Sequence, residues 1–165
     1  VANVIRFRGE KPDFKDAFVH YLGADYRNEN EDVSIVACGP AVAEAMRAAW
    51  ILKVDFDIES RVINLHTLKP IDIETIVRAA IECGVVLTVE EHQVGGMGSR
   101  VTSAIQTSKK LYRTPVLVDM LGVPDSFGET GAPWELMRVF GLTAEYIADK
   151  ARQLHHIRSI SRDSA

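Results

Sequence analysis

The chain has 165 residues, 47% of them hydrophobic and 25% charged, with a net charge of −4 at neutral pH. This length and composition are typical of one soluble globular domain. The acidic balance argues against a nucleic-acid-binding protein, which usually has an excess of basic residues on one face. No apolar run approaches the ~18 residues of a membrane span, and charged residues interrupt the N-terminus where a signal peptide would be apolar. Cys38 and Cys83 are too few for a disulfide framework and favour a reducing, cytoplasmic location.

The first 32 residues differ from the rest of the chain. Residues 1–7 have the pattern of a short strand, and polar segments rich in Asp, Asn and Glu follow them. We expect residues 1–32 to be the end of an upstream domain and a linker. Residues 33–155 are predicted to form the folded domain, and residues 156–165 a polar, frayed tail.

From Val33 onward, strand and helix patterns alternate. Short apolar runs, typical of strands buried on both faces, lie at residues 33–38, 61–66, 85–89 and 115–121. Helical patterns separate and follow them, at residues 40–52, 72–83, 98–110, 132–140 and 144–155. This alternation predicts an α/β fold of three layers, in which a mainly parallel, twisted sheet lies between helices on both faces.

Several residues mark the predicted helix ends. Asp72 is a typical N-cap, and Gly84 is expected to stop the same helix. Pro133 suits the first turn of a helix, which Gly141 then ends. Thr143 is predicted to cap the last helix, with Glu145 in its first turn.

One cluster of polar residues and glycines follows the predicted strand at 85–89. It consists of Glu90, Glu91, His92, Gly95, Gly96 and Gly98. The carboxylates and imidazole could act in acid–base chemistry or bind a metal, and the glycines at a helix start could hold an anion. We favour a structural interpretation, in which the glycines allow a tight turn and the glutamates cap it or face a partner. No third metal ligand has suitable spacing, and the acidic pair disfavours a phosphate.

The other candidates are weaker. The turn after the first buried strand has one glycine, not the three of a dinucleotide fingerprint. Cys38 precedes a helix, which would stabilise a thiolate, but a small buried hydrophobic residue is the favoured interpretation. Lys69 could contact an anion, and Trp50 and Trp134 are predicted to be packing residues. No catalytic, cofactor-binding or metal-binding residue is assigned.

Three segments together resemble the C-terminal domain of the transketolase family. Residues 64–72 are similar to the family's Thr-x-Lys-Pro-x-Asp strand–turn–helix entry. Residues 89–98 are similar to its Glu-Glu/Asp-His followed by Gly-Gly-x-Gly. Residues 127–133 resemble its Phe-Gly loop, which leads to a second Phe-Gly-Leu-Thr. The resemblance covers about residues 33–154 and implies that residues 1–32 end a pyrimidine-binding domain.

The resemblance implies a parent enzyme that uses thiamine diphosphate and Mg²⁺ to move two-carbon ketol units between sugar phosphates. The family's metal–diphosphate signature and activating Glu have no counterpart in residues 33–165, so no cofactor ligand is carried over to this chain. We therefore expect a non-catalytic assembly domain that partners thiamine-binding domains or a subunit, as a homodimer. Two alternatives remain open. The parent could be a 2-oxoacid dehydrogenase β-chain or a deoxyxylulose-phosphate synthase, or the chain could be a free-standing regulatory module that binds a small anion at Gly95–Gly98.

A partner-facing surface is predicted where two segments leave the sheet. Glu90, Glu91 and His92 follow one strand, and Phe127 lies in the loop after another. Because the carboxyl ends of parallel strands meet at one edge, we expect the two segments to lie on the same side of the domain. Loops held by a rigid scaffold are common recognition sites.

Overall fold

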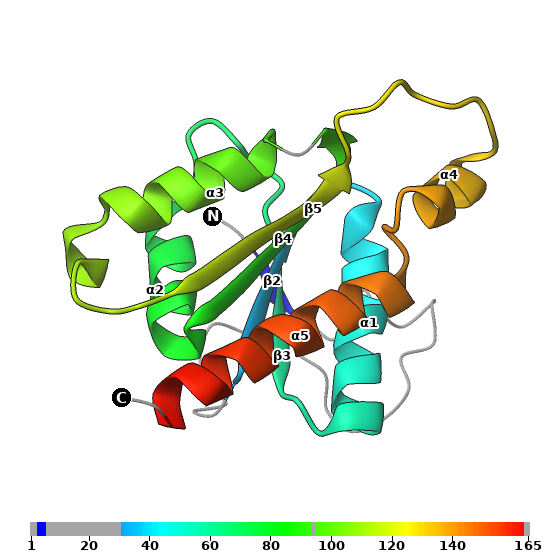
Figure 1. Ribbon diagram of the computed structural model, residues 1–165. Helices are drawn as coiled ribbons and strands as arrows, with labels where there is room; N and C mark the ends of the chain where they lie inside the picture. Colours follow the sequence, from blue (N-terminus) through cyan, green and yellow to red (C-terminus); the bar gives the residue numbers. More distant parts are fainter. Residues whose placement is uncertain (1–2, 6–30, 94, 164–165) are drawn as a thin grey trace.

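The structure, a computed structural model, describes residues 3–5, 31–93 and 95–163 (Figure 1). The predicted linker falls mostly on residues 6–30 and so lies outside the described part. The strands are β1 (Asn3–Ile5), β2 (Val33–Ala37), β3 (Ser60–Asn64), β4 (Val85–Gln93) and β5 (Leu117–Val123). The helices are α1 (Ala41–Phe56), α2 (Ile73–Cys83), α3 (Met97–Thr107), the short 3₁₀ helix η1 (Lys109–Leu111), α4 (Pro133–Val139) and α5 (Ala144–Asp163).

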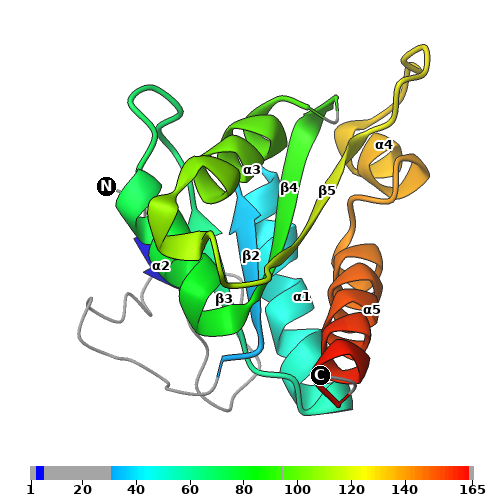
Figure 2. The ribbon, with the colours of Figure 1, turned by 60° about the vertical axis from the view of Figure 1, so that its left-hand side comes forward.

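The predicted three-layer α/β fold is confirmed. The strand order is β1-β3-β2-β4-β5, in which β3, β2, β4 and β5 are parallel and β1 is antiparallel to β3. Helices α1 and α5 cover one face of the sheet, and α2 and α3 cover the other (Figures 1 and 2). The chain moves from β2 to β3 and then crosses back to β4 and β5. This reversal places the helices on opposite faces when each crossover is right-handed.

The strands are apolar because both faces of the sheet are covered. In β2, Val33 and Ile35 pack toward α1 and α5, whereas Val36 packs toward α2 and α3. In β4, Leu87 and Val86 divide between the two faces in the same way. Each side chain removed from water contributes roughly 1.5–3 kcal/mol, so this burial holds the strand ends in fixed positions.

Most predicted helix ends are confirmed. The Asp72 carboxylate accepts the amide of Thr75 at 3.0 Å, and Gly84 follows α2 in the left-handed region with φ of +72°. Gly141 ends α4 with φ of +69°, and Pro133 is the first residue of that helix. These local signals were sufficient because each one acts on backbone groups within one helical turn.

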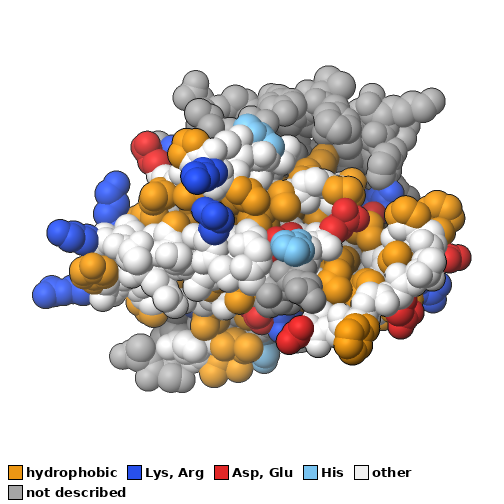
Figure 3. Space-filling model, turned by 90° about the horizontal axis from the view of Figure 1, so that it is seen from above, with side chains coloured by type: hydrophobic (Ala, Val, Ile, Leu, Met, Phe, Trp, Pro, Cys, Tyr) orange, Lys and Arg blue, Asp and Glu red, His pale blue; other side chains and the backbone are white. Residues whose placement is uncertain are grey.

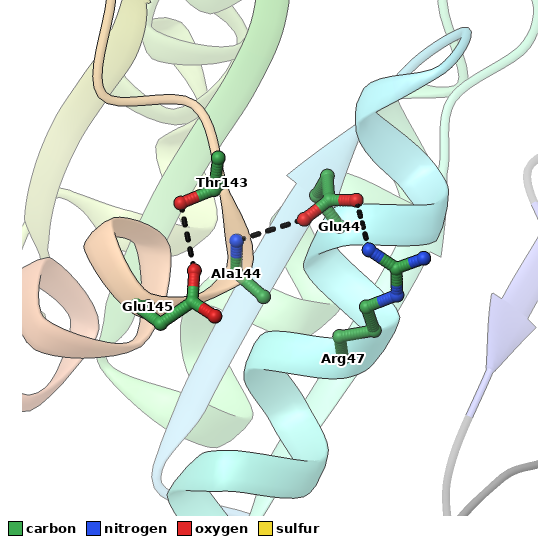
Figure 4. Close-up of polar contacts among 5 residues, drawn as sticks. All are labelled: Glu44, Arg47, Thr143, Ala144 and Glu145. Atoms are coloured by element: carbon green, nitrogen blue, oxygen red, sulfur yellow. Dashed lines mark hydrogen bonds and ion pairs between the residues drawn. The ribbon is translucent and has the colours of Figure 1, made fainter. Parts of the chain in front are cut away.

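The start of α5 differs from the prediction. The hydroxyl of Thr143 donates to the Glu145 carboxylate at 2.8 Å. The first amide of the helix, from Ala144, instead donates to Glu44 of α1 at 2.9 Å (Figure 4). Glu44 also pairs with Arg47 at 2.5 Å. The cap therefore comes from a residue 100 positions away, which binds the start of α5 to α1.

Three further features depart from the sequence analysis. Helix α5 continues to Asp163, so most of the predicted frayed tail is helical. Arg158 on this last part lies against Gly84, where an added Cβ would be 2.9 Å from its Nη2. Residues Asn3–Ile5, assigned to an upstream segment, pair with β3 at the edge of this same sheet. Strand β4 runs on to Gln93 through a register shift, so it contains the predicted Glu90–His92 segment.

Candidate functional site

The two segments predicted to share an edge leave the sheet side by side. At the carboxyl ends of β4 and β5, Gln93 pairs with Val123. The glycine turn follows β4. The loop 124–132 follows β5 and extends away from the sheet (Figure 1). We call residues 124–132 the projecting loop. The predicted placement of the two segments at one edge is confirmed.

Glu90 is buried and caps α3. The residue is 3% exposed, and its carboxylate accepts the amides of Met97 at 2.7 Å and of Gly98 at 3.0 Å. This is the position that a bound anion takes at a helix N-terminus. The predicted capping role of a glutamate is thus confirmed for Glu90, whose side chain points into the domain and is not available to a partner.

The glycines allow this close approach. Gly95 has φ of +115°, which confirms the prediction of at least one glycine at positive φ in this turn. A Cβ on Gly96 would lie 2.5 Å from the Glu90 carboxylate, and one on Gly98 would lie 2.7 Å from Thr88 Oγ1. The turn is therefore shaped by backbone geometry and by the enclosed carboxylate.

A diphosphate–metal group does not fit this position. The start of α3 already contains the Glu90 carboxylate, which would repel a phosphate at the same amides. Within the part of the chain that the structure describes, no group of three or more His, Cys, Asp or Glu residues could hold a metal ion. The regulatory-anion alternative likewise gains no support, since the chain's own carboxylate binds the amides at Gly95–Gly98.

Cys38 lies near the same edge, at the end of β2. Burial raises the pKa of its thiol, and the charges of Glu90 and Glu91 raise it further. A thiol with a raised pKa is protonated and weakly nucleophilic at neutral pH. Neither Cys38 nor Cys83 is in a disulfide. The arrangement supports the interpretation of Cys38 as a packing residue.

The outer part of the edge exposes polar and aromatic side chains. Glu91 and His92 are exposed. Phe127 is 100% exposed on the projecting loop, and Trp134 is 71% exposed on α4. The prediction of Trp134 as a packing residue is therefore wrong. Seen from above, hydrophobic side chains lie among charged ones on this side of the molecule (Figure 3).

Helix α4 rests lightly on the domain. It has no buried residue, and only its half-buried Met137 and the following Phe140 pack against the core beneath α1 and α5. Val139 on its outer side is 59% exposed. The apolar side chains of this segment are thus only partly turned inward. Its outer side leaves apolar surface available for another protein.

A groove beside α3 was missed by the sequence analysis. It has a volume of about 400 Å³ and lies between α3 and the segment that enters α2. Ile71 and Ile73 form an apolar wall, and Ser99, Arg100 and Ser103 form a polar one. The only local signal is the spacing of small hydroxyl residues at one side of α3, which does not by itself indicate a groove.

The domain matches a known family along most of its length. The profile described as "Transketolase, C-terminal domain" matches residues 23–147. A 6-deoxy-6-sulfo-D-fructose transketolase subunit from Clostridium sp. is 39% identical over 79% of this chain and 39% of that protein. A 1-deoxy-D-xylulose-5-phosphate synthase from Thermomicrobium roseum is 41% identical over 77% of this chain and 20% of that protein.

A solved structure agrees in fold. The structure titled "Split gene transketolase, inactive beta4 tetramer" has 37% sequence identity and a TM-score of 0.68, and the alignment covers 78% of this chain and 40% of that one. The curated relatives are longer than this chain, which spans 39% of the sulfofructose transketolase subunit. None of the described helices is long and apolar enough to cross a membrane. The family profile and these relatives together establish that the chain belongs to the transketolase C-terminal domain family.

Proposed function

We propose that this chain is the structural and assembly domain of a transketolase-type enzyme that transfers two-carbon ketol units between sugar phosphates. By itself the chain is not catalytic. Glu90 supports this view, since the helix start that could receive a phosphate is bound by the chain's own carboxylate. The parent enzyme uses thiamine diphosphate and Mg²⁺, which residues outside this domain bind.

The observation that carries the proposal is the full exposure of Phe127. An aromatic ring with 100% exposure on the projecting loop, followed by Trp134 at 71%, leaves apolar area that a partner can bury. Aromatic residues are enriched at protein–protein interfaces. The partner-facing surface consists of Glu91, His92, Phe127 and Trp134, in front of the buried Glu90.

The partners are thiamine-binding domains or a thiamine-binding subunit, and a second copy of the chain in a homodimer. Relatives described as transketolase subunits support this view, because such a subunit works with another chain. Two cysteines that form no disulfide support a reducing, cytoplasmic location.

One alternative parent has specific support. The synthase from T. roseum is 41% identical to this chain, so the same domain could be the assembly domain of a deoxyxylulose-phosphate synthase. The two parents differ in the thiamine-binding domains that precede this one. Sequencing the reading frame upstream of Val1 separates them.

The assembly proposal is tested by the mass of the chain in solution. We expect light scattering after size exclusion to show concentration-dependent association of the wild-type chain. A Phe127→Ser/Trp134→Ser variant should remain monomeric because it loses the exposed aromatic area.

The matched control is Ile157→Ser/Ile160→Ser. Like Phe127 and Trp134, these two side chains are large, hydrophobic and exposed, at 49% and 53%. They belong to α5, whose C-terminal part lies at the other end of the domain (Figure 1). They should leave association unchanged. A wild-type chain that stays monomeric at high concentration, or a control variant as defective as the aromatic one, would contradict the proposal.

A further inference from the structure

Strand β5 forms an outer edge of the sheet. It comes last in the strand order, and none of the described strands lies beyond it (Figures 1 and 2). Apart from Gly122, its residues are only half-buried, whereas every residue of β2 in the middle of the sheet is buried. The strand is apolar except for Asp119. Unpaired backbone groups along such an edge are a template for a strand of another molecule.

The pairing of β5 with β4 shows which backbone groups face outward. The amide of Leu117 donates to the carbonyl of Gly84 at 3.0 Å, so it points toward β4. The backbone groups of successive residues in a strand point to opposite sides. Those of Val118 and Met120 therefore point away from β4, and an added strand would have to pair with them.

The outward amide of Met120 is already bound by the chain itself. It donates to Oδ1 of Asp119 at 2.8 Å. The other carboxylate oxygen, Oδ2, lies 2.7 Å from Nζ of Lys150 on α5. The carboxylate thus lies across the edge of the sheet, with one oxygen on the strand and the other on the helix that covers it.

This arrangement opposes the addition of a strand. A partner strand would have to place a carbonyl oxygen where the Asp119 carboxylate accepts the Met120 amide. Pairing would then break a hydrogen bond to a charged acceptor or bring that acceptor against another one, and both cost free energy. Proline bounds the strand on both sides, since Pro115 and Pro124 have no amide to donate.

We propose that Asp119 closes the β5 edge to strand addition and that Lys150 holds its carboxylate in place. The observation that carries the inference is the Met120 amide, which faces outward and is bound within the chain. The closure does not depend on the surface through which the chain assembles, so the inference goes beyond the proposed function.

A labelled peptide tests whether the edge is closed. The probe is a fluorescent synthetic peptide with the sequence of residues 116–123, carrying Asp119→Ala and flanked by lysines for solubility. Fluorescence anisotropy measures its binding to the chain. The Asp119→Ala chain should bind the peptide about tenfold more tightly than the wild-type chain, because its Met120 amide is available to a partner. Asp149→Ala is the matched control, which removes an exposed carboxylate from α5 and should leave peptide binding unchanged.

Two further measurements show whether the peptide binds as a strand. N-methylation of alternate peptide amides blocks one edge of the peptide, so one of the two possible methylated sets should abolish binding to the Asp119→Ala chain. Hydrogen exchange followed by NMR should show faster exchange of the Met120 amide in Asp119→Ala than in the wild-type chain. Exchange of this amide should slow again when the peptide is bound. Circular dichroism and thermal melting verify that each variant folds.

The results separate this inference from the proposed function. Equal peptide binding by the wild-type and Asp119→Ala chains would overturn it, as would a Met120 amide that exchanges at the same rate in both. If Asp119→Ala fails to fold, Lys150→Met is the second variant: it releases one carboxylate oxygen and should also increase peptide binding, and no increase would overturn the inference. A wild-type chain that stays monomeric would contradict the assembly proposal and leave the closed edge unaffected.

Discussion

At the scale of single residues, Glu90 shapes the candidate site without contacting a partner. Its carboxylate accepts two buried amides, from Met97 and Gly98. Glu91, the next residue, is exposed. Neighbouring glutamates in one strand thus have different roles, because successive side chains of a strand point to opposite faces.

Glu90→Ala should lower the free energy of unfolding by about 2–4 kcal/mol, since two buried amides lose their acceptor. Chemical denaturation at neutral pH measures the change. Glu91→Ala is the matched control and should change stability by less than about 0.5 kcal/mol. Equal losses in the two variants would argue against the capping role.

Cys38 should react slowly with alkylating reagents. Its pKa is raised above the ordinary value of 9.0, chiefly by burial and then by the charges of Glu90 and Glu91. In a Cys83→Ala background, the alkylation rate at pH 8 should be lower than in the denatured chain and should rise with pH through a midpoint above 9.0. Glu91→Gln should increase the rate, because it removes one of the repelling charges. A rate independent of this substitution and equal to that of the denatured chain would exclude the effect.

The residue-level predictions succeeded where the signal was local. Asp72 and Gly95 act through backbone groups a few positions away, so composition and spacing indicate their roles. The exposure of Trp134 could not be read in this way. Pro133 and an amphipathic pattern predict a helix, but not how lightly that helix packs on the domain.

At the scale of elements, the link between α1 and α5 fixes the position of α4. The amide of Ala144 donates to Glu44, and the amide of Leu142 donates to the carbonyl of Met137 at 2.7 Å. These bonds bracket the turn between α4 and α5. A hydrogen bond from Thr143, together with the more distant charges of Arg47 and Arg138, lowers the pKa of Glu145 next to this turn.

Glu44→Ala should destabilise the domain by about 1 kcal/mol, the usual effect of losing a helix cap. The amide of Ala144 should also exchange with solvent faster, as measured by hydrogen exchange with mass spectrometry. Thr143→Ala serves as the comparison and should affect this amide less, because the Thr143 hydroxyl bonds to Glu145. If Thr143→Ala accelerated exchange of the Ala144 amide more than Glu44→Ala, Thr143 would be the cap instead.

The elements themselves could be predicted because β2 and β4 are apolar on both faces and each is followed by a helical pattern. The exceptions depend on distant contacts. Helix α5 continues past residue 155, where Arg158 lies against Gly84. The cap from Glu44 joins residues 100 positions apart. Neither contact can be predicted from a short stretch of the sequence.

At the scale of the whole molecule, the domain has the topology of a ligand-binding α/β sheet, but its own side chains occupy the crevice in which such sheets bind a ligand. The order of the strands reverses between β2 and β4, and ligands of open α/β sheets bind at such a reversal. Here Cys38 and Glu90 lie at this point, and the carboxylate of Glu90 binds the start of α3. The crevice thus holds a fixed negative charge.

The isolated chain should therefore not bind thiamine diphosphate, with or without Mg²⁺. A diphosphate at the start of α3 would compete with Glu90 for the amides of Met97 and Gly98, and its charge would be repelled by Glu90 and Glu91. Isothermal titration calorimetry with thiamine diphosphate and Mg²⁺ should give no binding heat, whereas an intact thiamine enzyme in the same buffer serves as the positive control. Micromolar affinity of the wild-type chain for thiamine diphosphate would contradict the prediction and would mean that this domain contributes part of the cofactor site. Affinity that appears only in Glu90→Ala would instead support it, because that change alone opens the amides of α3.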